Sequence, residues 1–288
     1  MSIEPSKVYG CMGCGTVILL YMRVFRDKRV DVLVVLLILF IGFSLVWVLQ
    51  GTYFSKPLIA WALFIVLPIV IYLSLRKSKP FRFIAMGTFL FGVVFALVLE
   101  TMAELNGAWH VVDTVFTYRF PGGASLDAIL GYLFMTLLTL VIYEHFIDSP
   151  HIGKMKLSSR RVAVALLPSA CIVILLFIFS TYAPNLISVN HLYLKAGIAA
   201  ILPAIIIGFQ NPKIYTKMAQ IMPLFFLIYL AFEFLAVKFS WWTYPSGQYI
   251  GTVSLFGVSF PFEELFFWML FYAGSLVVYY EKWIDDGK

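Results

Sequence analysis

The sequence Phe260-Pro261-Phe262-Glu263-Glu264-Leu265-Phe266-Phe267-Trp268 opens an apolar run that continues to Tyr280. Proline is common in the first turn of a helix, and carboxylates near a helix N-terminus complement the helix dipole. We therefore expect a membrane helix that begins here, with Glu263 and Glu264 in its first turn. Two interpretations stay open: the acids face water at the mouth of the helix, or they form a functional site, because buried ionisable groups in a membrane are costly.

Composition indicates the class of protein. Apolar residues make up 62% of the 288 residues and charged residues only 12%, which is typical of a polytopic membrane protein. The predicted fold class is an all-α helical bundle with about eight transmembrane helices. The expected spans are Asp31–Leu49, Pro57–Leu75, Phe83–Leu105, Leu126–Ile147, Val162–Tyr182, Leu192–Phe209, Met218–Val237 and Phe262–Lys282.

Basic residues are concentrated in alternate connections between these spans. Because basic loops stay in the cytoplasm, the pattern predicts a multi-pass protein of the cell membrane with both termini cytoplasmic. The net charge of +6 is explained by these loops, so we expect no nucleic-acid partner. The loops hold Arg23, Arg26, Lys28 and Arg29, then Arg76, Lys77, Lys79 and Arg82, then Lys154, Lys156, Arg160 and Arg161, and finally Lys213 and Lys217.

The chain also repeats itself. Residues 142–148 read Ile-Tyr-Glu-His-Phe-Ile-Asp, and residues 279–285 read Tyr-Tyr-Glu-Lys-Trp-Ile-Asp. Upstream, Leu-Glu-Thr-Met-Ala at 99–103 with Trp109 matches Phe-Glu-Phe-Leu-Ala at 232–236 with Trp241 or Trp242. We therefore predict two tandem four-helix halves, residues 1–150 and 151–288, related by an axis along the membrane normal.

The predicted helix directions bring six acids toward the outer face of the membrane. Carboxyl groups that are crowded together and partly desolvated can keep a proton at neutral pH and donate it. The alternative is that one or two of them only bind helix ends. The six acids are Glu100, Glu104, Asp127, Glu233, Glu263 and Glu264.

Aromatic residues flank these acids, and aromatic faces stabilise cations. Many of them also fit an interfacial belt or a lipid-facing surface, but acids beside aromatic rings in a dry pocket suit carbocation chemistry on a hydrocarbon. No nucleotide-binding motif appears, and the lone Cys11-Met12-Gly13-Cys14 is a weak metal motif. We therefore expect no cofactor and no metal. The flanking residues include Trp109, Trp241, Trp242, Tyr244, Phe262, Phe266, Phe267 and Trp268.

Three segments carry a resemblance to a known family: residues 232–242, residues 260–268 and residues 278–281. Together they resemble the repeat of membrane-embedded lycopene cyclases of the heterodimeric or fused type. The resemblance is good over residues 190–285 and weak over 55–148. In that family a Pro-x-Glu-Glu motif and an upstream acid are thought to serve acid–base chemistry, which implies Glu263, Glu264 and Glu233 here. The first half has Ser-Leu-Asp-Ala at 125–128 instead of the motif, and each half has one helix more than the family's three-helix repeat.

The resemblance implies an isomerase (intramolecular lyase) of carotenoid biosynthesis that cyclises the linear ψ-end groups of a lycopene-like, lipid-soluble polyene. Either Glu263 or Glu264 is the expected acid, and Glu233 and Glu100 are the expected base or proton relay. Trp241 and Trp242 are expected to stabilise the cation, and the remaining candidate substrate contacts are Trp109, Phe262, Phe266, Phe267, Asp127 and Glu104. The alternatives are a carotenoid hydratase, in which water captures the same cation, and a non-catalytic carotenoid-binding membrane protein or transporter.

Overall fold

The computed structural model describes residues 28–76, 80–148 and 159–284. Helix makes up 76% of the described residues, which confirms the all-α class. Within these ranges, six helices are long and apolar enough to cross a membrane: α2 (Lys28–Val48), Pro57–Arg76, Phe81–Asn106, α7 (Leu126–Phe146), α9 (Leu192–Gln210) and α10 (Pro212–Lys238). Cys11, Cys14 and many of the basic residues that set the predicted orientation lie outside the described residues.

The two other predicted spans are helical as well. The first is α8 (Ser159–Tyr182), whose apolar part runs from Leu166 to Tyr182. The second is the π-helical segment η5 (Glu264–Phe271), which continues into α11 (Tyr272–Trp283). The full count of eight transmembrane helices stays a prediction. One predicted boundary is wrong: α10 begins at Pro212 rather than near Met218, because Asn211 caps it by accepting from the backbone N–H groups of Lys213 and Ile214.

Two of the long spans contain a widened, π-helical turn. In the span Pro57–Arg76, α3 (Pro57–Trp61) and α4 (Leu67–Arg76) are joined by η2 (Ala62–Val66). Pro68 has no N–H to donate to the preceding turn, which accounts for an irregular ladder here. In the span Phe81–Asn106, α5 (Phe81–Phe89) and α6 (Phe95–Asn106) are joined by η3 (Leu90–Val94). At Gly92 within η3, an added Cβ would lie 2.9 Å from the Cα atom of Leu133 in α7, so glycine lets these two helices touch.

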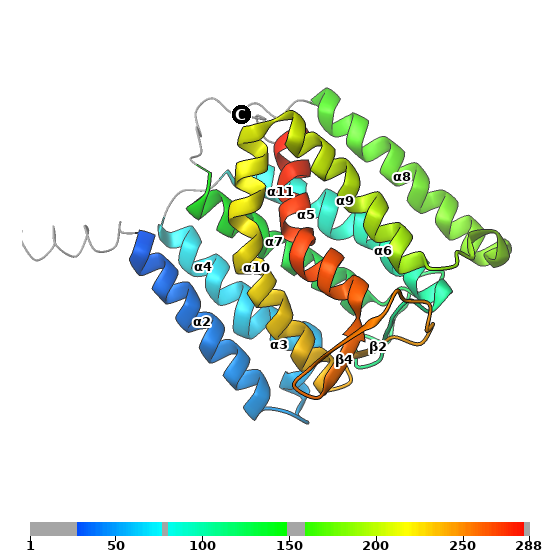
Figure 1. The fold of residues 1–288 in the computed structure, drawn as a ribbon, viewed down its shortest axis with the longest axis horizontal. Coiled ribbons are helices and arrows are strands. Elements are labelled where there is room, and N and C mark those ends of the chain that lie inside the picture. The colour runs from blue at the N-terminus through cyan, green and yellow to red at the C-terminus, as the bar shows by residue number, and fades with distance from the viewer. Residues whose placement is uncertain (1–27, 77–79, 149–158, 285–288) are drawn as a thin grey trace, which may run out of the picture.

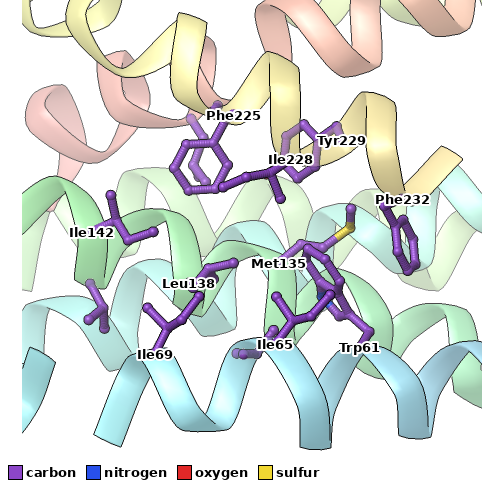
Figure 2. Close-up of a cluster of buried hydrophobic side chains, with 14 of the residues drawn as sticks. Trp61, Ile65, Ile69, Met135, Leu138, Ile142, Phe225, Ile228, Tyr229 and Phe232 are labelled. Carbon is purple, nitrogen blue, oxygen red and sulfur yellow. The ribbon is translucent and has the colours of Figure 1, made fainter. Parts of the chain in front are cut away.

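The main core is formed by side chains from three stacked layers of helices. Figure 2 shows α7 between α10 on one side and the α3–α4 span on the other. The contacting side chains are Trp61, Ile65 and Ile69 from the α3–α4 span, Met135, Leu138 and Ile142 from α7, and Phe225, Ile228, Tyr229 and Phe232 from α10.

The outermost helices, α2 and α8, lie on opposite flanks of the bundle (Figure 1). They expose large apolar side chains, for example Phe40, which is 71% exposed, and Leu167, which is 66% exposed. Apolar surfaces of this extent need a partner or a lipid environment. The exposed flanks are therefore consistent with a membrane protein.

Four short strands lie at one end of the bundle, here called the strand end (Figure 1). Strand β1 (His110–Val111) pairs antiparallel with β2 (Trp242–Thr243), so the loop after α6 is joined to the loop after α10. Strands β3 (Thr252–Leu255) and β4 (Val258–Pro261) form a hairpin that leads into η5. Pro261 therefore ends a strand instead of lying in the first helical turn, and the helix begins at the next residue. Phe256 and Gly257 have positive φ angles of 49° and 80° at the hairpin tip, as a tight two-residue turn requires.

Candidate active site

A cavity of about 90 Å³ lies at the strand end, where the C-terminal ends of α6 and α10 meet the first turns of α7, α9 and η5. Three carboxyl groups line it, from Glu100, Asp127 and Glu264, and most of the remaining wall is aromatic. This cavity is here called the acid cavity. Its other lining residues are Pro57, Leu58, Trp61, Trp109, Val111, Ala128, Gly131, Tyr132, Met135, Tyr193, Phe232, Trp242, Tyr244 and Trp268.

Glu264 projects into the acid cavity from the first turn of η5 and is only 5% exposed. The hydroxyl of Tyr193, from the first turn of α9, donates a hydrogen bond to Oε2 of Glu264. Both residues come from helix ends that sequence hydropathy places at the same depth. A carboxyl group held by a tyrosine hydroxyl inside an aromatic wall is a suitable proton donor to an apolar ligand.

Glu100, on α6, is held by a tryptophan from the loop that follows the helix. The indole Nε1 of Trp109 donates to Oε1 of Glu100 over 2.8 Å, and both residues are buried. Gly107 makes this return possible, because it ends α6 in the left-handed conformation with φ at 63°. The second oxygen of Glu100, Oε2, is buried without a hydrogen-bond partner among the described residues, and the hydroxyl of Tyr132 lies near this carboxyl group.

Glu233, on α10, is held in the same way as Glu100 but lies just behind the wall of the acid cavity. The indole Nε1 of Trp242 donates to Oε1 of Glu233 over 3.1 Å, and the hydroxyl of Tyr244 donates to the same oxygen over 2.6 Å. Trp242 and Tyr244 line the cavity, so they connect Glu233 to it. Burial, followed by the nearby Glu233 carboxylate, raises the pKa of the Tyr244 hydroxyl well above its ordinary value, so Tyr244 stays protonated and remains a hydrogen-bond donor.

The two glutamate–tryptophan pairs have equal spacing, since nine residues separate Glu100 from Trp109 and Glu233 from Trp242. The residues that follow the two tryptophans belong to β1 and β2, which pair with each other. His110 and Thr243, each of which directly follows the tryptophan of its pair, are therefore partners in this two-stranded sheet.

A second set of matched contacts joins α7 to α11 at the opposite end of the bundle. The hydroxyl of Tyr143 donates to Glu281, and the hydroxyl of Tyr280 donates to Glu144 over 2.7 Å. Each tyrosine of the repeated Tyr-Glu pair therefore binds the glutamate of the other copy. All four residues are fully buried.

The other three predicted acids are engaged with the backbone or with cations. Asp127 lines the acid cavity, but its two oxygens accept from the N–H groups of Val115 and Phe116, over 2.6 and 2.9 Å. Glu263 is fully buried outside the cavity and accepts from the N–H of Ile250 over 2.8 Å. This bond fixes the start of the hairpin segment against η5.

Glu104 anchors the loop after α6 and does not line the acid cavity. It accepts from Arg119 over 3.0 Å and binds Nδ1 of His110 over 2.6 Å. Arg119 also donates to the carbonyl groups of Val111 and Gly123. Six predicted acids thus gather at one end of the bundle, and only three of them face the cavity.

The predicted aromatic residues separate into four groups. Trp109, Trp242, Tyr244 and Trp268 line the acid cavity. Trp241 is buried in the main core, 1% exposed, and does not line the cavity. Phe262 and Phe266 stack on each other, and both are exposed at the surface of the bundle, whereas Phe267 lines a second, neighbouring cavity.

Sequence reasoning missed several cavity residues, including Trp61, Tyr132, Tyr193 and Phe232. Tyr132 and Tyr193 lie within the first two turns of their predicted spans, at the depth expected for the acids, and this was a usable signal. Phe232 precedes Glu233 in the repeated segment 232–236, which was a second usable signal, whereas no sequence pattern distinguishes Trp61 from the other apolar residues of its span.

No protein-family model, curated protein or solved structure matches this chain. Within the described ranges, no three or more His, Cys, Asp or Glu side chains are grouped so that they could hold a metal ion.

Proposed function

We propose that this chain is a membrane-embedded enzyme that cyclises the ψ-end groups of a linear, lycopene-like carotenoid by acid–base catalysis. One observation carries the proposal: Glu264 and Glu100 face a small cavity whose wall is otherwise largely aromatic and apolar. Such a cavity combines a proton donor, a proton acceptor and cation-stabilising rings around space suited to a hydrocarbon end group.

In the proposed reaction, the carboxyl group of Glu264 transfers its proton to the terminal carbon–carbon double bond and leaves a tertiary carbocation. The electron pair of a neighbouring double bond attacks this cation and closes a six-membered ring, which moves the positive charge into the ring. A carboxylate then removes a ring proton and restores a double bond. Atoms and electrons balance without an oxidant or reductant, so the product is an isomer of the substrate.

The positions of the acids support particular roles. Glu264 lines the acid cavity and Glu263 does not, so we assign Glu264 as the acid. Glu100 lines the cavity, and its Oε2 has no hydrogen-bond partner among the described residues although the Tyr132 hydroxyl lies near, so we assign Glu100 as the base. Glu233 lies behind Trp242 and Tyr244 and acts through them as a positioning residue or proton relay. The rings of Trp109, Trp242 and Trp268 surround the cationic intermediates.

The proposal includes eight spans arranged as two four-helix halves, with both termini cytoplasmic and the strand end outside. The matched Glu100–Trp109 and Glu233–Trp242 bonds support the two halves, as do the exchanged bonds of Tyr143 with Glu281 and of Tyr280 with Glu144. Residues equivalent in the two halves make equivalent contacts, as a two-fold axis along the bundle requires.

Expression in a host that accumulates lycopene tests the function. We expect new pigments with one or two rings and with the mass of the starting carotenoid, and only the starting pigment with Glu264→Gln. Pigments that have gained water indicate the hydratase alternative. If wild-type protein is present in the membrane and the lycopene is unchanged, this substrate assignment is wrong.

A further inference from the structure

A second cavity of about 380 Å³ adjoins the acid cavity, between η3, α6, α8, α9, η5 and α11. It is here called the long cavity. Its wall is almost entirely apolar, and the flat rings of Phe91, Phe95, Phe267, Tyr272 and Tyr279 form much of it. Nothing in the proposed proton transfers uses this space.

The two cavities share part of their walls. Trp109, Tyr193 and Trp268 line both of them. The rings of Trp109 and Tyr193 are in contact, with centroids 4.9 Å apart. A ligand that occupies both cavities would pass beside these three side chains, next to the Glu264 carboxyl group that Tyr193 holds.

Helix α9 forms one wall of the long cavity. Three small residues of this helix, Ala196, Gly197 and Ala200, line the cavity together with Tyr193, Ala199 and Ile201. At Gly197 an added Cβ would lie 2.2 Å from the ring of Phe267, so glycine is needed for α9 to approach η5. The opposite face carries Ile198, which is 45% exposed. Helix α9 therefore forms one wall of the cavity, with small side chains at three lining positions, and Ser169 of α8 lines the cavity as well.

We propose that the long cavity holds the remaining chain of the polyene whose end group lies in the acid cavity, and that this chain enters from the bilayer past α9. The inference rests on the proposed function. The acid cavity, with a volume of about 90 Å³, has room for one end of such a molecule. The long cavity, at about 380 Å³, has about four times that volume. Flat aromatic walls suit a rigid conjugated chain.

Two consequences follow for the reaction. The long cavity selects substrates by chain length, because most of the apolar contact is made away from the reacting end. It also binds one orientation of a symmetric substrate at a time. A molecule with two reactive ends must therefore leave and return reversed before its second ring closes.

Filling the long cavity tests the inference. Two variants, Ala200→Phe and Ala196→Phe, each place a ring in the cavity. The matched control is Ile198→Phe, which adds the same ring on the lipid side of α9. Purified proteins in lipid nanodiscs are titrated with lycopene, and binding is followed by quenching of tryptophan fluorescence. Turnover is measured with lycopene and with a truncated polyene that has the same end group. Thermal melting identifies any variant that does not fold.

We expect folded Ala200→Phe or Ala196→Phe protein to bind lycopene at least about tenfold more weakly than wild type. The same variants should keep turnover of the truncated polyene, and Ile198→Phe should resemble wild type in both assays. If a folded cavity variant binds lycopene as strongly as wild type does, the inference is overturned. If such a variant has in addition lost a phospholipid that co-purifies with wild type, the cavity is a lipid site.

The outcomes separate this inference from the proposed function. If wild type binds lycopene, the cavity variants do not, and no ring forms, the long cavity is assigned correctly and the cyclase proposal fails. If all variants cyclise and bind lycopene equally well, the cyclase proposal stands and the long-cavity assignment fails.

Discussion

Replacing Glu264 with Gln removes the proposed acid while leaving its surroundings intact. Glutamine has almost the same volume as glutamate, and its amide oxygen can still accept the hydrogen bond that Tyr193 donates. What is lost is the proton that the carboxyl group transfers. The variant should therefore fold and bind polyene as wild type does.

The expected loss of activity follows from the role of the group. General acid–base catalysis contributes about two to four orders of magnitude to a rate, or roughly 3 to 5 kcal/mol of transition-state stabilisation. Ring closure by Glu264→Gln should therefore fall by about 10²- to 10⁴-fold. The assay is the single-turnover rate of ring formation, read by separating cyclic from linear pigment.

Glu263→Gln is the matched control, because the neighbouring acid lies outside the acid cavity. Its Oε1 accepts from the N–H of Ile250, and a glutamine oxygen can keep that bond. Its Oε2 is buried without a partner among the described residues, so the new amide costs about 1–3 kcal/mol of stability. We expect activity within about tenfold of wild type and a lower melting temperature. Equal losses of activity for the two variants would refute the assignment of Glu264 as the acid.

Three further predictions concern the supports of the site and its orientation. Asp127→Asn should lower ring formation less than Glu264→Gln does and should release one-ring product, since Asp127 mainly holds two backbone N–H groups; equal losses would mean that Asp127 is a second acid. Arg119→Ala should lower the free energy of unfolding by about 1–3 kcal/mol, because Arg119 ties Glu104 to two backbone carbonyl groups; an unchanged melting curve would contradict this anchoring role. In a background without native cysteines, Lys156→Cys and Gln248→Cys should be labelled by an impermeant thiol reagent from opposite sides of the membrane, and labelling from one side would contradict the topology.

Much of the fold is predictable from hydropathy because the bilayer imposes the length of each span. The depth of Glu100, Glu233 and Glu264 follows from the same spans together with the direction that loop charge gives to each helix. Their common level at the strand end was therefore predictable, whereas the sharing of one cavity by Glu100 and Glu264 was not. The strand role of Pro261 was missed because a proline before two acids also fits the first turn of a helix.

Which of two adjacent side chains lines the acid cavity was not predictable. Glu263 and Glu264 differ because the hairpin brings the N–H of Ile250 to one of them and α9 brings Tyr193 to the other. Trp241 and Trp242 differ because consecutive side chains of an extended segment point to opposite sides, and only the pairing of β1 with β2 decides which side faces the cavity. Both outcomes depend on contacts between distant segments, which a local pattern does not contain.

The most direct test of acid–base cyclisation is to run the reaction in D₂O and weigh the product. In the proposed reaction Glu264 draws its proton from exchangeable hydrogen, so each ring that closes should add one deuterium to the carotenoid, and Glu264→Gln should form almost no labelled product. A cyclic product without deuterium would contradict protonation by a carboxyl group as the step that starts ring closure.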